Sequence, residues 1–169
     1  MNEEDKFQLS RELLEHAWTA GPIEYIMTIT DAYLALLDGQ LTEYNMDELT
    51  PEQHTLLAYR YILDEVTEGG FIQLIQNGLG PYVLDGPFPM LMKKKWELED
   101  FGKFMYKVRN EYHRHRQALE ADMDEEQFMA LYEKYETMNE LGDQFLDDFY
   151  EETTPAIAEY VHRHEDKFI

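Results

Sequence analysis

Apolar residues recur at steps of three or four along most of the chain, which is the spacing of one face of an α-helix. The spacing is clearest in residues 49–80, where Leu56, Tyr59, Leu63 and Val66 form a single stripe. No segment alternates apolar and polar residues for long enough to predict a β-strand. The pattern therefore predicts an all-α fold, a compact single-domain bundle of about six or seven helices.

The stripe is preceded by a helix-start signal. Thr50 can act as the N-cap, and Pro51 occupies the first helical position, where its missing amide hydrogen costs nothing. Gln53 stands where the partner residue of a capping box reaches back to the cap. A helix is therefore predicted to begin at residue 51.

Two adjacent glycines, Gly69 and Gly70, interrupt the stripe. Glycine adopts the left-handed backbone of a helix C-terminus without steric cost, so the helix is predicted to stop here. Phe71 opens a second apolar turn, which is predicted to end near Asn77. The two helices should meet in a tight corner, called the glycine corner (Gly69 and Gly70) below.

Helical spacing also predicts elements on both sides of this stretch. They cover residues 3–18, 23–37, 90–119 and 125–152, and a last helix opens with Pro155 in its first turn. Residues 81–89, which include Gly86 and Pro87, are predicted to form an irregular loop.

Length and composition limit the organisation of the chain. A chain of 169 residues with 44% hydrophobic content suits one buried core, which predicts one domain over residues 1–169, with N-terminal helices in 1–48 and the remainder in 49–169. The absence of cysteine excludes disulfides and thiolate chemistry. No apolar run approaches the ~18 to 20 residues that span a bilayer, and residues 2–5 are acidic where a signal peptide is basic. A cytoplasmic protein is predicted.

The net charge of the chain limits the kinds of molecule that can bind to it. The chain has 36 acidic and 14 basic residues, a formal net charge of −22. Such a field repels nucleic acid and anionic membranes and attracts basic partners over long range. The sequence therefore predicts a basic protein as the partner, with no direct binding to nucleic acid or membrane, and leaves a homodimer open.

A row of acidic residues recurs at steps of three or four in residues 125–152. The row consists of Glu133, Glu136, Glu140, Asp143, Asp147 and Glu151 and is called the acidic ridge below. Each step rises ~4.5 to 6 Å along a helix, against roughly 3.4 Å per nucleotide of a duplex strand. The acidic ridge is a candidate partner-binding surface. In the alternative interpretation it is a solvated face, or it pairs with the basic residues of the helix predicted around residues 93–116.

Polar residues around the glycine corner are a second candidate site. In a catalytic interpretation Glu65 works with Asp64 as an acid–base pair, while Gln73 and Asn77 orient a substrate. In a structural interpretation Glu65 or Gln73 satisfies backbone amides left free at the helix break. Adjacent helix positions point about 100° apart, so the two carboxylates do not share one site, which favours the structural interpretation.

The histidines and the remaining acids do not form a metal motif. Two HisArgHis sequences place histidines two positions apart, where they diverge on a helix, and the arginines oppose a cation. The acidic cluster at residues 122–126 lacks the glycine and the distal glutamate of a calcium loop. Neither a metal nor a cofactor is predicted.

Two groups of residues match a known pattern. The first group is Thr50, Pro51, Glu52, Gln53, Glu65, Val66, Gly69, Gly70, Phe71, Gln73, Asn77 and Gly80. The second is Leu146, Asp147, Asp148, Phe149, Tyr150, Tyr160, His164 and Phe168. Both resemble the signature of a family of small acidic bacterial proteins, a domain of unknown function named after a DNA-mimic protein. The resemblance covers roughly the last two thirds of the chain and departs from the pattern at Glu68, Leu74 and Ile75.

The resemblance implies a DNA-mimic mechanism, and the charge is compatible with it. The preferred hypothesis is a non-enzymatic acidic protein that presents rows of carboxylates to a basic DNA-binding protein. One alternative is an immunity or antitoxin-like inhibitor that plugs the basic cleft of a nuclease. The other is a hydrolase that uses Glu65 near Gly69 and Gly70.

Overall fold

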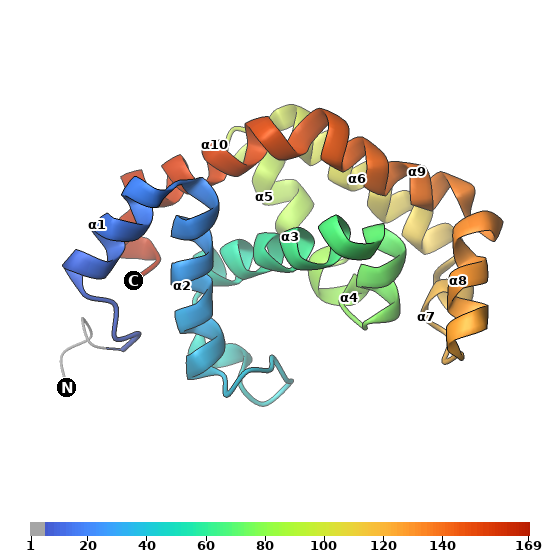
Figure 1. The fold of residues 1–169 in the computed structure, drawn as a ribbon, viewed down its shortest axis with the longest axis horizontal. Coiled ribbons are helices and arrows are strands. Elements are labelled where there is room, and N and C mark those ends of the chain that lie inside the picture. Colours follow the sequence, from blue (N-terminus) through green and yellow to red (C-terminus); the bar gives the residue numbers. More distant parts are fainter. Residues whose placement is uncertain (1–5) are drawn as a thin grey trace. The chain divides into compact units, whose positions relative to one another are not determined.

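Regular structure in the chain is helical throughout the part that the structure describes. The computed structural model describes residues 6–169, and this range contains helices but no strand (Figure 1). The prediction of an all-α fold is thereby confirmed. Among these residues, no helix combines the length and the apolar character that crossing a membrane requires.

Contacts between residues group the chain into two units. The first extends to Arg60 and resumes with Thr154–Ile169, and the second is Tyr61–Thr153. The chain leaves the first unit inside helix α3 (Pro51–Gln76) and returns to it inside α10 (Tyr150–Arg163). The single domain expected from the length stays a prediction.

The first unit contains α1 (Arg11–Ala20), α2 (Pro22–Leu36), the short 3₁₀ helices η2 (Met46–Glu48) and η4 (Glu165–Lys167), and the adjoining parts of α3 and α10. Its core is rich in aromatic rings, because Tyr25, Tyr33 and Tyr59 are fully buried. The hydroxyl of Tyr33 donates a hydrogen bond of 2.6 Å to the carbonyl of Phe168, which fixes the end of the chain.

The start of α3 confirms the predicted capping box. The backbone amide of Thr50 donates to the side-chain oxygen of Gln53 at 2.9 Å, and the amide of Gln53 donates to the hydroxyl of Thr50 at 3.3 Å. Pro51 is the first residue of the helix. Two amides that a helix start would leave without partners are thus satisfied.

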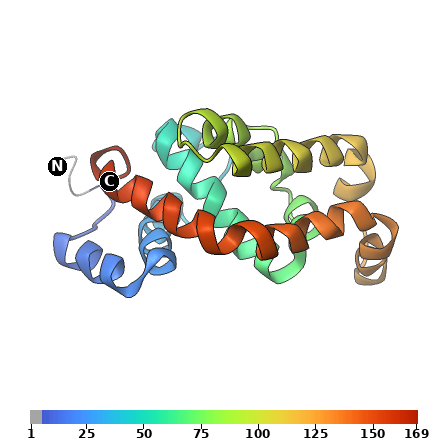
Figure 2. The same cartoon turned by 90° about the horizontal axis from the view of Figure 1, so that it is seen from above.

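The second unit contains the rest of α3 and the helices that follow it. These are α4 (Gly80–Val83), α5 (Phe88–Lys94), α6 (Glu99–Arg114), α7 (Arg116–Glu120), α8 (Glu125–Lys134), α9 (Glu136–Gln144) and the π-helical segment η3 (Phe145–Phe149). Helix α6 lies beside α9 (Figure 2). Helix α6 also contacts η3 through aromatic rings, whose centroids are 4.6 Å apart for Phe104 and Phe149 and 6.1 Å apart for Phe101 and Phe145.

The predicted long helix over residues 90–119 is wrong. The chain breaks twice, at Glu97, whose φ is 59°, and at His115, which gives three helices, α5, α6 and α7. A Cβ on Gly102 would lie 2.6 Å from the backbone nitrogen of Lys93. Helices α5 and α6 therefore pack backbone against backbone, and one continuous helix could not make that contact.

Other predicted boundaries also change. The helix over residues 125–152 is interrupted at Tyr135 and by η3, and Pro155 lies inside α10 rather than in its first turn. The predicted loop 81–89 is partly helical, since it holds most of α4 and the start of α5, and only residues 84–87, with Gly86 and Pro87, are irregular. The first helix begins at Arg11 with Ser10 as its N-cap, and residues 3–5 of the predicted element lie outside the described residues.

Candidate functional site

The structure places all six side chains of the acidic ridge at the surface of the second unit. Glu133 is on α8, Glu136, Glu140 and Asp143 are on α9, Asp147 is in η3 and Glu151 is on α10, and each is exposed. The sequence interpretation placed them on one helix. The structure distributes them over consecutive segments with a break at Tyr135, where φ is −113° and ψ is 59°.

Helix α9 carries the regular part of the acidic ridge. Glu136, Glu140 and Asp143 are separated by four and three positions, which puts them on one helical face. The opposite face carries Met138 and Leu141, which are buried. Because the apolar face is buried, the opposite face with the three carboxylates is turned towards solvent.

The carboxylates of the acidic ridge form no ion pair within 4.0 Å inside residues 6–169. The alternative interpretation paired them with the basic residues of α6. Lys103 instead lies 3.3 Å from Glu99, and Arg114 lies 3.6 Å from Glu111, both on α6 itself. The described residues therefore do not provide the predicted pairing between these two helices.

The glycine corner contacts the buried faces of α8 and α9, the two helices that carry most of the acidic ridge. A Cβ on Gly142 of α9 would lie 3.1 Å from the Cα of Gly70, so the two backbones are in close contact. The hydroxyl of Tyr132 on α8 donates a hydrogen bond of 2.7 Å to the carbonyl of Gly69. The corner thus fixes the inner faces of the two helices whose outer faces carry most of the ridge.

The backbone at the glycine corner requires glycine. Gly70 has φ 70° and ψ −173°, a conformation that only glycine adopts without strain. A Cβ on Gly69 would lie 2.1 Å from the side-chain oxygen of Gln73. The predicted helix break is confirmed, and at both positions steric constraints disfavour any residue other than glycine.

Three polar side chains close the corner by bonding to one another. One carboxylate oxygen of Glu65 accepts hydrogen bonds from the amide of Gln73 at 2.9 Å and from the amide of Asn77 at 2.8 Å. The structural interpretation of the sequence expected backbone amides as their partners. The side chains instead tie the helix before the break to the turn after it.

A charged cluster in the second unit was not expected from the sequence. Asp85, in the turn before α5, contacts His113, lies 2.9 Å from Nη1 of Arg116 and 4.0 Å from Nε of Arg109. Nothing in the spacing of residues 85 and 109–116 indicates this contact, because it depends on how α6 packs. Part of the basic segment is therefore neutralised by Asp85.

Near this cluster, the environment of Tyr112 raises the pKa of its hydroxyl. Burial raises the pKa of Tyr112, and the hydrogen bond of 3.0 Å that its hydroxyl donates to Glu120 raises it further. Glu120 also lies 2.7 Å from Nε of Arg116, which spreads the network from α6 to α7. Within residues 6–169, no three histidines or carboxylates converge as metal ligands would.

A second cluster lies in the first unit. Glu165 contacts Arg11 and accepts a hydrogen bond of 2.6 Å from the hydroxyl of Tyr25. Burial by itself would raise the pKa of Glu165, but the hydrogen bonds from Tyr25 and Arg11 outweigh it, so its pKa is lowered. His162 stacks on Trp18 at 3.9 Å, and the two rings are nearly parallel.

These features define a class: acidic all-α proteins in which carboxylates are held outward on packed helices. The family described as "DMP19-like protein" matches residues 47–164, and the chain belongs to this family. The matched range contains both the glycine corner and the acidic ridge, so the resemblance noted in the sequence is confirmed.

A curated relative also matches the chain. The DNA mimic protein DMP19 of Neisseria meningitidis serogroup B is 31% identical over 103 residues, which are 61% of this chain and 61% of that protein. The chain therefore spans less than two thirds of the length of this relative.

Proposed function

We propose that this protein is a DNA mimic that presents the acidic ridge to a basic DNA-binding protein, and that it acts by occupying that surface without catalysing a reaction. The observation that carries the proposal is a row of six exposed carboxylates without ion pairs among the described residues. Membership of the DMP19-like family and the name of the relative support it.

The ridge suits this role because its charges are closely spaced and fixed. Carboxylates on α9 follow one another at a rise of roughly 4.5 to 6 Å, which provides one carboxylate for every one or two phosphates of a strand at roughly 3.4 Å per nucleotide. Packing of Gly142 against Gly70 holds the helix that carries them. A protein surface that binds phosphates through lysine and arginine would bind such a row by the same electrostatic attraction.

The partner should be a cytoplasmic DNA-binding protein. A nuclease with a basic cleft offers the same chemistry, and the identity of the captured protein distinguishes the two. Residues Glu65, Gln73 and Asn77 contribute to the fold in this proposal, because their polar groups bond to one another across the corner.

The test is affinity capture from an extract of the native cell, followed by binding measurements with the captured protein. The test variant replaces the ridge by the matching amides: E133Q, E136Q, E140Q, D143N, D147N and E151Q. We expect its affinity to fall at least tenfold, the wild-type affinity to fall steeply with salt, and duplex DNA to displace the wild-type protein.

The control variant carries the same kinds of substitution, four Glu→Gln and two Asp→Asn, at exposed carboxylates of the first unit. It carries E12Q, E15Q, E24Q, E43Q, D38N and D47N. Both variants have a formal net charge of −16, because six charges are removed from −22. Equal losses in the two variants, or an affinity independent of salt, would contradict the proposed role of the ridge.

A further inference from the structure

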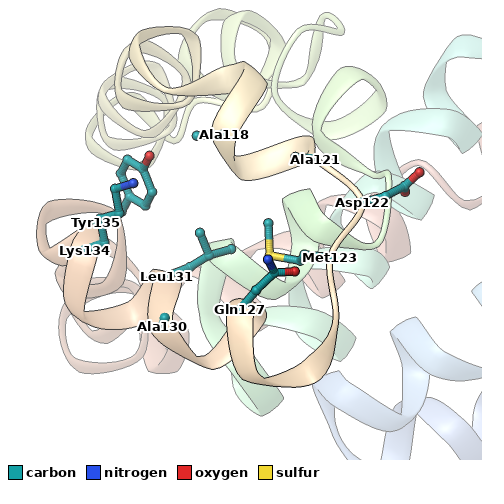
Figure 3. A pocket seen from close by; sticks show the side chains of 9 residues that line it. All are labelled: Ala118, Ala121, Asp122, Met123, Gln127, Ala130, Leu131, Lys134 and Tyr135. Carbon is teal, nitrogen blue, oxygen red and sulfur yellow. The ribbon is translucent and has the colours of Figure 1, made fainter.

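An apolar groove of about 330 Å³ lies between α7 and α8, at the end of the second unit where the acidic ridge begins (Figure 3). Figure 3 shows Leu131 of α8 and Met123 of the connection between the two helices extending into the groove, below Ala118 of α7. Its volume is at the lower end of the ~300 to 1,000 Å³ typical of binding pockets.

Small side chains keep this groove open. Ala118 and Ala130 contribute only methyl groups to its walls, while Leu131 is buried. Apolar surface of this kind is stabilised when another apolar side chain covers it, because water is then released.

The charges around the groove indicate what can cover it. Residues 116–135 contain six acidic and two basic residues. One of the two, Arg116, is paired with Asp85 and Glu120. The other, Lys134, lies over the ring of Tyr135, 5.7 Å from its centroid. The groove is thus an apolar strip within a surface that attracts positive charge.

We infer that the groove binds the apolar side chains of a basic amphipathic helix on the protein partner. This inference rests on the proposed function and adds to it the chemistry of the partner. Glu133 belongs to the ridge and lies three positions after Ala130 of the groove, which makes the two residues neighbours on the surface of α8, so one partner segment can contact both. Leucines four positions apart would enter the groove, and flanking lysines or arginines would face the carboxylates.

Such a groove gives a specificity that phosphate mimicry lacks. Carboxylates alone attract any basic surface, whereas an apolar anchor selects partners that present an apolar side chain beside their basic residues. Apolar burial also persists at high salt, where attraction between charges is screened.

The probe is a synthetic 14-residue helical peptide with lysines on one face and two leucines four positions apart on the other. A second peptide of the same charge has serines in place of the leucines. Binding is followed by NMR of methyl-labelled methionines in the full chain, with the Met123 signal assigned through M123L. We expect the leucine peptide to shift the Met123 signal and the serine peptide to bind at least tenfold more weakly.

Two variants locate the binding. A130W fills the groove at an exposed helical position, and A35W places the same ring at an exposed position of α2 as the matched control. We expect A130W to weaken binding of the leucine peptide at least tenfold in 300 mM salt, and A35W to change it less than twofold. Circular dichroism checks that both variants fold.

Failure of this inference can be told apart from failure of the proposed function. If the six-residue ridge variant loses partner binding while A130W keeps it and the Met123 signal does not move, the groove assignment is wrong and the DNA-mimic proposal stands. If A130W loses binding while the ridge variant keeps it, the proposed function is wrong. A Met123 signal that shifts on concentrating the protein alone assigns the groove to a second copy of the chain and overturns the inference.

Discussion

Gly70 is the residue on which the local geometry of the second unit depends most. Its φ of 70° with ψ of −173° is available to glycine alone without strain. Its backbone also lies directly against Gly142 of α9, where an added Cβ would be only 3.1 Å away. The backbone conformation of Gly70 therefore determines where α3 breaks and where α9, with the regular part of the acidic ridge, packs against it.

A substitution at this position should be costly. G70A is expected to lower the free energy of unfolding by about 1 to 3 kcal/mol, because alanine would be held in a conformation that its Cβ disfavours. Urea unfolding followed by circular dichroism measures the change. E68A, at an exposed position two residues earlier, should change it by less than about 0.5 kcal/mol, and equal effects in the two variants would contradict the steric argument.

Glu165 gives the fold a dependence on pH. Its pKa is lowered in the folded state from the ordinary value of 4.5, so the carboxylate stabilises the fold above that pH, and the contribution is lost as the pH falls through the folded pKa. E165Q should therefore be less stable than the wild type by about 1 kcal/mol at pH 7, since Arg11 is exposed and its ion pair is screened.

The difference between wild type and E165Q should shrink as the pH falls below about 4.5, which urea unfolding at several pH values measures. E24Q removes an exposed carboxylate from the same unit and is the control. If the E165Q difference is the same at pH 7 and at pH 3, the hydrogen bonds from Tyr25 and Arg11 do not stabilise the ionised form.

At the scale of single elements, the ends of the helices decide where side chains point. The capping box at Thr50 starts α3, and the breaks at Glu97, His115 and Tyr135 divide what the apolar spacing predicts as two long helices. Each break lets the following helix pack against a new neighbour, as α5 and α6 do through Gly102.

Removing the cap should destabilise α3. T50A is expected to lower the free energy of unfolding by about 1 kcal/mol, because the amide of Gln53 loses the hydroxyl that accepts its hydrogen. Thermal unfolding followed by circular dichroism measures it. T137A, an exposed threonine of α9, is the comparison, and a T50A effect no larger than that of T137A would mean that the cap contributes nothing.

At the scale of the whole molecule, the formal net charge of −22 opposes folding through self-repulsion. Ion pairs such as those of Asp85 and Glu165 compensate only part of it. A charge excess maintained at this cost to stability is compatible with a binding role for the uncompensated carboxylates.

Salt should therefore stabilise the fold while it weakens partner binding. Raising sodium chloride from 10 to 300 mM is expected to raise the midpoint of thermal unfolding by about 2 to 4 °C, the shift that about 1 kcal/mol produces in a chain of this size. The ridge variant and its first-unit control should both show a smaller rise, because each has lost six negative charges. A midpoint that falls with salt would contradict net repulsion.

The sequence by itself determined the helical class, the capping box, the break at Gly69 and Gly70, the acidic excess and the family pattern. These features are local or additive: apolar spacing, cap chemistry and glycine conformation act within a few residues, and net charge is a sum. Glu65, Gln73 and Asn77 were also expected near one another, since all lie within about two helical turns of the break.

Only the tertiary structure decided the divisions at Glu97, His115 and Tyr135, the Asp85 cluster, the groove between α7 and α8, and the position of Pro155 inside α10. Each depends on contacts between residues distant in the chain, such as Gly102 against Lys93 or Arg116 against Asp85. Helical spacing continues unchanged across a break, so it cannot indicate where the chain turns to pack against another helix. For the same reason, the absence of ion pairs between the acidic ridge and α6 within the described residues required the packed structure.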